Sequence, residues 1–141
     1  DFPKYLVLRE KLILKLEFII RQLQGDGHDI NDFEIMSGYR TPYYNKQLNN
    51  VPHSRHLWGG AADIYVDSDN NGRMDDLNGD GASDWRDSRW LARYIKSFRD
   101  NPDWNRWIGG VGYYDSTSMH GPFVHVDARG FPASWSGISD S

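Results

Sequence analysis

The chain has 141 residues, no cysteine and a formal charge of −4 at pH 7, from 16 basic and 20 acidic side chains. This length suits one globular domain with its own core. The absence of cysteine excludes disulfide frameworks, thiol nucleophiles and zinc–thiolate sites, and the charge offers no basic surface for nucleic acid or an anionic membrane. We therefore expect a single monomeric domain over residues 1–141 that binds no nucleic acid.

An amphipathic helix is the first predicted element, from Pro3 to about Gln24. Its apolar residues recur at three- and four-residue spacing and Gly25 supplies a stop. Charged residues interrupt this stretch, so we expect no membrane span. A short strand around Phe33 and Ile35 follows, and residues 41–60 are expected to be mostly loop, with room for a short helix over 43–48.

Alternating apolar residues predict a second strand over 62–66, followed by an acidic loop over 67–87. The next helix is expected to begin at an N-cap at Asp87 or Ser88 and to end before Asn101. Further strands are predicted over 108–114 and 123–127, and an irregular tail after Gly130. Because helices and strands do not alternate regularly, the pattern favours an α+β fold: a small, mainly antiparallel sheet flanked by helices, with the acidic loop as an insertion.

The acidic loop carries seven Asp against two Arg, a local charge of −5, and repeats itself with an offset of nine residues. Its second copy matches a twelve-residue calcium loop, with the ligand positions in order and Gly81 at the sharp turn. Numerous hard oxygen ligands favour calcium over magnesium, although an acidic loop that is simply solvated is the alternative. We predict a structural calcium site that uses Asp67, Asp69, Asn71, Arg73, Asp75, Asp76, Asn78, Asp80, Ala82, Asp84 and Asp87.

A second group of metal-binding residues is more widely spaced. His56 lies in a loop that turns at Gly59–Gly60 into the strand that carries Asp63, and His125 lies on a later strand. Two imidazoles and one carboxylate would leave a fourth position of a tetrahedral zinc ion open to water, which is the arrangement of a catalytic site and not of a closed structural one.

Four blocks of sequence resemble one known family in the same order. They are Ser37–Thr41, residues 54–63 with the pattern Ser-x-His-x-x-Gly-x-Ala-x-Asp, Gly109–Tyr114, and Phe123–Asp127 with the sequence Phe-Val-His-Val-Asp. Together they resemble the zinc D-Ala-D-Ala carboxypeptidase and murein endopeptidase family, relatives of lysostaphin-type enzymes. The resemblance covers residues 33–130 apart from the acidic insertion. It implies zinc held by His56, Asp63 and His125, and cleavage of peptide bonds in peptidoglycan outside the cytoplasm.

The resemblance also suggests roles for nearby residues. Arg40 matches an arginine that binds substrate in the family, and its planar guanidinium suits a carboxylate or an oxyanion. His120 is the leading candidate for acid–base catalysis, and Asp127 is placed either to orient His125 or to bind substrate. Many relatives carry a general base two or three residues before the last zinc ligand, where this chain has Phe123 and Pro122. Either His120, Asp127 or Asp115 substitutes as the base, or the metal-bound hydroxide acts with less help.

Three functions are consistent with these motifs. The first is a zinc peptidase of peptidoglycan stem peptides or cross-links, either a carboxypeptidase or an endopeptidase. The second is a non-catalytic wall-binding or signalling module that keeps zinc for structure, as a missing base would allow. The third is a calcium-regulated hydrolase of other peptides.

Overall fold

A computed structural model describes residues 2–36, 61–117 and 120–137, with side chains from Glu10 onward. The helix considered for 43–48 lies outside these residues. In chain order, the elements are α1 (Phe2–Gly25), β1 (Glu34–Ile35), β2 (Ala61–Tyr65), α3 (Trp85–Lys96), the short 3₁₀ helices η2 (Ser97–Asp100) and η3 (Pro102–Trp107), β3 (Gly110–Tyr114), β4 (Phe123–Asp127) and β5 (Ala133–Gly137).

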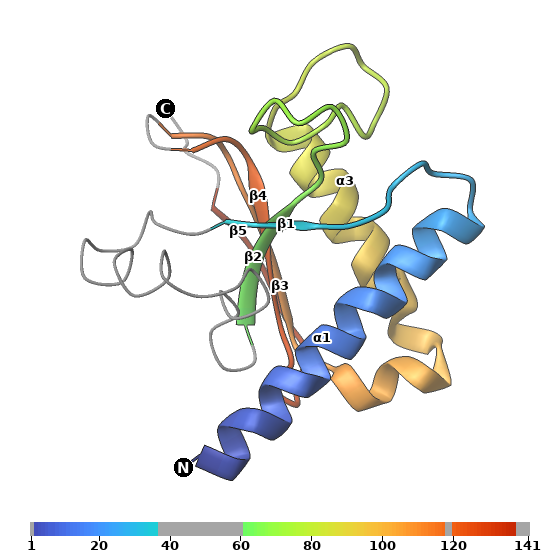
Figure 1. The fold of residues 1–141 in the computed structure, drawn as a ribbon, viewed down its shortest axis with the longest axis vertical. Coiled ribbons are helices and arrows are strands. Elements are labelled where there is room, and N and C mark those ends of the chain that lie inside the picture. Colours follow the sequence, from blue (N-terminus) through green and yellow to red (C-terminus); the bar gives the residue numbers. More distant parts are fainter. Residues whose placement is uncertain (1, 37–60, 118–119, 138–141) are drawn as a thin grey trace.

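The strands form one five-stranded mixed sheet in the order β1-β2-β4-β3-β5. The pairs β1–β2, β2–β4 and β3–β4 are antiparallel, and β5 runs parallel to β3. Both long helices lie on the same side of this sheet (Figure 1). The α+β class, the mainly antiparallel sheet and the single compact domain expected from the sequence are confirmed.

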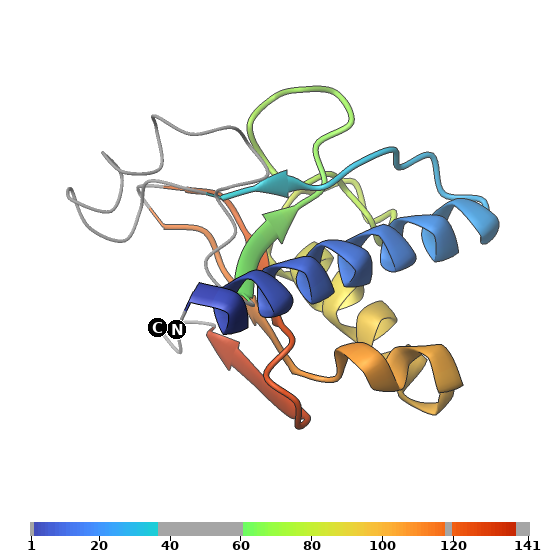
Figure 2. The same cartoon turned by 60° about the horizontal axis from the view of Figure 1, so that its bottom comes forward.

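The two faces of the sheet differ because side chains alternate along each strand. Ile64, Val124 and Val126 point toward the helices and are fully buried in the same core as Leu91 of α3. Asp63, at an intervening position of β2, therefore belongs to the opposite face. Figure 2 shows α1 crossing the helical side of the sheet. The helices therefore pack against one face of the sheet to form the core, and the opposite face carries polar side chains such as Asp63.

One polar residue of α1 lies in the core. The buried face of the helix is formed by Leu12, Leu16, Ile19 and Leu23, and Lys15 among them is also fully buried. Its ammonium donates a hydrogen bond of 2.6 Å to the backbone carbonyl of Asp127 and lies 4.8 Å from the ring centroid of Trp104. Burial lowers the pKa of Lys15 to about 8, although the nearby charge of Asp127 opposes the shift.

The start of α3 differs from the sequence prediction, which placed the N-cap at Asp87 or Ser88. The helix is capped by Asp84, whose side chain accepts a hydrogen bond from the backbone N–H of Arg86. Asp87, three residues later, accepts in return from the backbone N–H of Asp84 at 2.8 Å. This reciprocal capping box satisfies N–H groups that would otherwise have no partner at the helix start, which is why the helix begins earlier.

The prediction of an irregular tail was also wrong, because residues 133–137 form β5. Trp135 explains how this polar strand is held: its indole lies across two glycines of β3, so a Cβ on Gly112 would come within 2.2 Å of the ring and one on Gly110 within 2.8 Å. The indole N–H donates to the Tyr114 hydroxyl at 2.6 Å. The strand is thus specified by one aromatic contact and not by an apolar alternation.

Across the described residues, no helix has both the length and the apolar character needed to cross a bilayer.

Candidate functional site

Asp63 and His125 lie opposite each other on neighbouring strands. They are paired in the register of β2 and β4, and the His125 Nδ1 atom lies 2.9 Å from Asp63 Oδ1. The Asp63 side chain is 2% exposed and that of His125 16% exposed. Strand pairing therefore brings together two of the three residues named as zinc ligands from the sequence, which are 62 positions apart.

Asp127 contacts the second nitrogen of the same ring. His125 Nε2 lies 3.0 Å from Asp127 Oδ2, so the imidazole lies between two carboxylates. Burial disfavours the imidazolium, but hydrogen bonds to Asp127 and Asp63 outweigh it and raise the pKa of His125. Burial acts against the charged form of Asp127 as well, but hydrogen bonds from His125, Arg129 and the backbone hold the pKa of this carboxyl well below its usual range.

Glycines allow β3 and the residue before it to approach Asp127 closely. The backbone N–H of Gly110 donates to Asp127 Oδ1 at 2.7 Å. A Cβ on Gly109 would lie 1.9 Å from the Asp127 carbonyl oxygen, and one on Gly110 would lie 2.8 Å from Asp127 Oδ2. A larger residue at either position would push the carboxylate away from His125. The glycine-rich block noted in the sequence thus has a structural function at this site.

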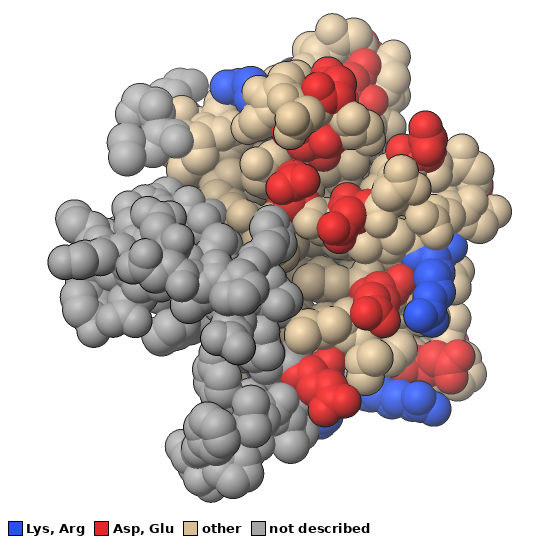
Figure 3. All heavy atoms as spheres, viewed as in Figure 1, with Lys and Arg blue, Asp and Glu red and all other residues tan. Residues whose placement is uncertain are grey.

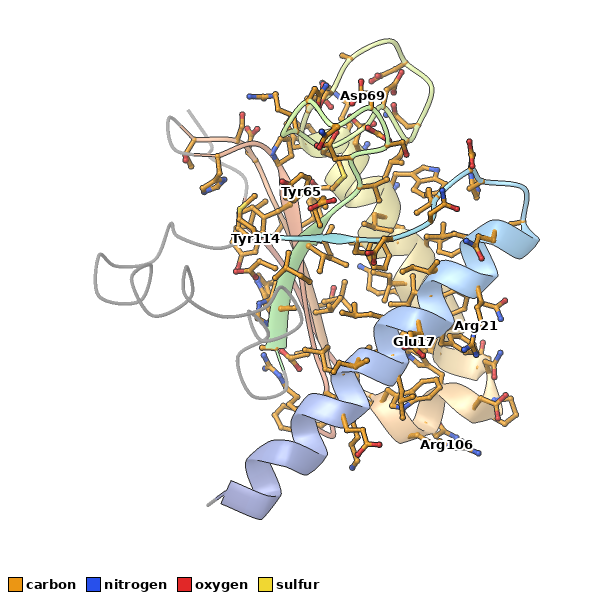
Figure 4. All side chains as sticks on the ribbon, viewed as in Figure 1. Glu17, Arg21, Tyr65, Asp69, Arg106 and Tyr114 are labelled. Atoms are coloured by element: carbon orange, nitrogen blue, oxygen red, sulfur yellow. The ribbon has the colours of Figure 1, made fainter. Side chains whose placement is uncertain are left out.

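Asp63 and His125 line a pocket of about 520 Å³ on the sheet face away from the helices. Its walls also include His120, Arg129, Tyr114 and Trp135, and the Trp135 and His125 ring centroids are 5.2 Å apart. Figure 4 shows Tyr114 on this side of the sheet, far from Glu17 and Arg21 on α1. The pocket is therefore open to a ligand that approaches from the side opposite the core.

His120 is oriented by its own chain. Its Nδ1 atom lies 2.8 Å from the carbonyl oxygen of Gly121, to which it donates a hydrogen bond. The neutral ring therefore keeps its lone pair on Nε2. Phe123 is buried and stacked on Tyr114 at a centroid distance of 4.6 Å, so this position, two residues before His125, supplies packing and no proton acceptor.

Two residues named from the sequence, Arg40 and His56, lie outside the described residues. The structure adds one that the sequence analysis did not name, Arg129. Its Nε and Nη2 atoms donate to the two oxygens of Asp127 at 2.9 and 2.6 Å. The signal for this residue was the spacing of His125, Asp127 and Arg129, because every second residue of an extended chain faces the same side.

The acidic loop keeps its nine-residue repeat in three dimensions. Asp67 accepts hydrogen bonds from the backbone N–H groups of the residues four and five positions later, and Asp76 does the same. Gly72 and Gly81 have φ angles of +82° and +87°, which favour glycine. Two groups of carboxylates have oxygens within 4.8 Å of one another: Asp67, Asp69 and Asp75, and Asp76, Asp80 and Asp87.

The other residues proposed as calcium ligands have different surroundings. Asp84 caps α3 and pairs with Arg86 at 3.1 Å. The Asn71 and Asn78 amides donate to Asp69 and Asp80 within the loop. Arg73 and Ala82 donate their backbone N–H groups to Asn71 Oδ1 and Asp80 Oδ1. Acidic side chains gather at the top of the molecule, where this loop lies (Figure 3). In the first group Asp69 is exposed and the other two are half-buried, whereas in the second Asp76 and Asp80 are exposed and Asp87 is buried.

Comparisons with protein-family models, curated proteins and solved structures found no match.

Proposed function

We propose that this protein is a zinc metallopeptidase that cleaves peptide bonds in the stem peptides or cross-links of peptidoglycan, and that it acts outside the cytoplasm. The observation that carries the proposal is the pairing of Asp63 with His125 in a pocket on one face of the sheet. The four sequence blocks that resemble the zinc carboxypeptidase and endopeptidase family support the choice of substrate.

The donor atoms fit zinc. A buried carboxylate oxygen and an imidazole nitrogen lie 2.9 Å apart, and oxygen and nitrogen donors of this kind are the usual ligands of catalytic zinc. Asp63 and His125, with His56 from the same motif, would hold the ion. Zinc bound there would lower the pKa of a bound water and polarise the carbonyl of the scissile bond.

Asp127 orients His125 for this purpose. It faces Nε2, which leaves Nδ1 on the side of Asp63. A carboxylate that accepts from the far nitrogen of a ligand histidine fixes the ring and its tautomer. Because Asp127 is also held by Gly110 and Arg129, orientation of His125 is a better assignment than substrate binding, the alternative that the sequence left open.

His120 is proposed to transfer the proton. Since Nδ1 donates to the Gly121 carbonyl, Nε2 is the atom that would first accept the proton released by the attacking water and then pass that proton to the leaving amine. Arg40 retains its proposed role in substrate binding. The aromatic wall of Tyr114 and Trp135 beside His125 would exclude water from the bound peptide.

We propose that the acidic loop binds calcium and so holds the start of α3. Support comes from the two groups of close carboxylates and from Asp87, which belongs to one of them and is part of the α3 capping box. Asp87 also accepts from the backbone N–H of Leu77 at 2.8 Å. An ion bound at Asp87 would therefore connect the loop to the helix.

The test is digestion of purified peptidoglycan together with metal analysis. The wild-type protein is expected to contain about one zinc per chain and to release peptide fragments. Asp63→Ala and His125→Ala are expected to lose both, whereas Arg106→Ala, an exposed change in η3, is expected to keep both. Wall binding and bound zinc without any cleavage would contradict the peptidase and favour the non-catalytic module.

A further inference from the structure

Arg129 is an ordered cation in the wall of the pocket that contains Asp63 and His125. Its backbone N–H and side chain both bond to Asp127. Its guanidinium carbon lies 5.3 Å from the ring centroid of Trp135 and 5.6 Å from that of Phe131. An arginine held by a carboxylate and two aromatic rings loses little side-chain freedom when it binds a ligand.

The guanidinium has two edges that can each grip a carboxylate. Asp127 occupies the edge formed by Nε and Nη2. The other edge is formed by Nη1 and the second hydrogen of Nη2, and within the described ranges neither has a hydrogen-bond acceptor. The side chain is 37% exposed. Arg129 can thus keep its bond to Asp127 and bind a second anion at the same time.

The charges around the pocket suit this use. Asp127 balances the charge of Arg129, and Asp63 is reserved for zinc in the proposed function. Asp115, also in the pocket wall, accepts from the backbone N–H of Ser116 at 2.7 Å. Asp127 occupies only the inner edge of Arg129 and zinc would take up the charge of Asp63. The outer edge of Arg129 therefore still presents two N–H donors of a cation to the ligand, with Asp115 as the remaining anion in the wall.

We infer that Arg129 is a specificity-determining residue that binds a carboxylate of the substrate through its outer edge, while Asp127 holds the inner edge. This inference rests on the proposed peptidase function. The ligand is a peptide with a free carboxylate near the bond to be cleaved, either at its C-terminus or on a side chain. A substrate in which that carboxylate is an amide would lose the charge-assisted pair.

The experiment compares four stem peptides that differ only in whether the C-terminal carboxylate and the side-chain carboxylate are free or amidated. Wild-type protein is expected to show a KM about 10- to 100-fold lower for the peptide with the recognised carboxylate, with kcat little changed. Arg129→Gln is expected to remove this difference. Arg129→Lys keeps the charge but lacks the second edge, so its KM difference between acid and amide should fall between those of wild type and Arg129→Gln. Arg106→Gln is the control and should behave as wild type.

If Arg129 only supported Asp127, the kinetic result would be different. Loss of support for Asp127 would lower zinc content or kcat for all four peptides to the same extent, and that result would overturn the inference. Cleavage by the wild type with no preference between acid and amide would also overturn it, while the peptidase function would stand.

A separate binding measurement covers the case in which the protein is not a peptidase. If the zinc-loaded protein cleaves none of the peptides, the same four are titrated into it by calorimetry. Tighter binding of an acid than of its amide, lost in Arg129→Gln, supports the carboxylate site without catalysis. Equal or absent binding of all four contradicts it.

Discussion

The acidic loop and the pocket on the sheet both gather carboxylates, but they are built in different ways. In the loop, Asp67 and Asp76 accept from backbone N–H groups four and five residues away, and the side chains are largely exposed. At the pocket, Asp63 in its wall and Asp127 beside His125 are buried, and they bond to groups on other strands and in the segment that follows β4. In Figure 4, Asp69 of the loop and Tyr114 of the pocket lie in separate parts of the molecule.

This difference shows what each site depends on. The loop needs only its own sequence and two turns with positive φ, so it should keep its geometry when distant residues change. The pocket depends on strand register, on close approach of glycines and on Lys15 of α1, which bonds to the Asp127 carbonyl from the core side. Changes far away in the chain should therefore affect the pocket and spare the loop.

The largest expected effect concerns Lys15. Below pH 8 both folded and unfolded chains carry the protonated amine, so the cost of burying it is fully present. Between about pH 8 and 10.5 the folded chain releases a proton that the unfolded chain retains, and the free energy of unfolding rises by about 3 kcal/mol. Urea unfolding of wild type and Lys15→Met across this range should show the rise in wild type alone.

Because the pocket depends on Lys15 and the acidic loop does not, calcium binding should be unchanged in Lys15→Met. A difference in free energy between the two proteins that stays constant from pH 7 to 10.5 would mean that Lys15 titrates in the folded chain as it does in water.

Calcium should stabilise the protein through the loop. Added to metal-free protein at 100 times its dissociation constant, calcium is expected to raise the free energy of unfolding by about 2.7 kcal/mol. Asp76→Asn should lose this gain, because it removes a charge from one of the carboxylate groups, but should keep the gain produced by zinc. Thermal unfolding with each ion separately measures both effects, and an equal response of wild type and variant to calcium would exclude the site.

Asp127→Asn tests the pocket in the same way. Loss of the carboxylate beside His125 Nε2 is expected to weaken zinc affinity by about 10- to 100-fold. The response to calcium should be unchanged. Competition with a zinc indicator gives the affinity. Wild-type zinc affinity in this variant would show that Asp127 does not orient the histidine.

The smallest expected effect is at Gly81. Its φ is +87°, and no atom lies within 4 Å of an added Cβ, so Gly81→Ala should cost about 1–2 kcal/mol from backbone strain alone. Gly25→Ala, which has equal space and no positive φ, is the control. Unfolding of both variants in denaturant measures the difference. Zinc content should be the same in both, since neither residue touches the pocket.

The features that follow local rules were predictable from the sequence. Alternating apolar residues predicted β2 and β4, and therefore that Asp63 and His125 lie on neighbouring strands. The repeat of Asp and Asn around Gly72 and Gly81 gave the turns of the acidic loop, because each ligand position is fixed by its immediate neighbours.

The features that depend on distant contacts could not be predicted from the sequence. Nothing in the sequence around Lys15 indicates that its amine reaches the Asp127 carbonyl, 112 residues later. β5 has no apolar alternation, and its position follows from the fit of Trp135 over the glycines of β3. Asp84, which the motif predicts to be a calcium ligand, also caps α3. The motif did not indicate this second role, because it depends on where the helix begins.

The parallel pairing of β5 with β3 has a consequence for the order of assembly. Residues 133–137 are the last described part of the chain, and they bring the indole that stands against His125. During synthesis, the other four strands leave the ribosome earlier and can associate first. A nascent chain, or one clipped after Arg129, would contain Asp63, His125 and Arg129 but not the indole wall of the pocket, so we expect the proposed peptidase activity to appear only once β5 has been added.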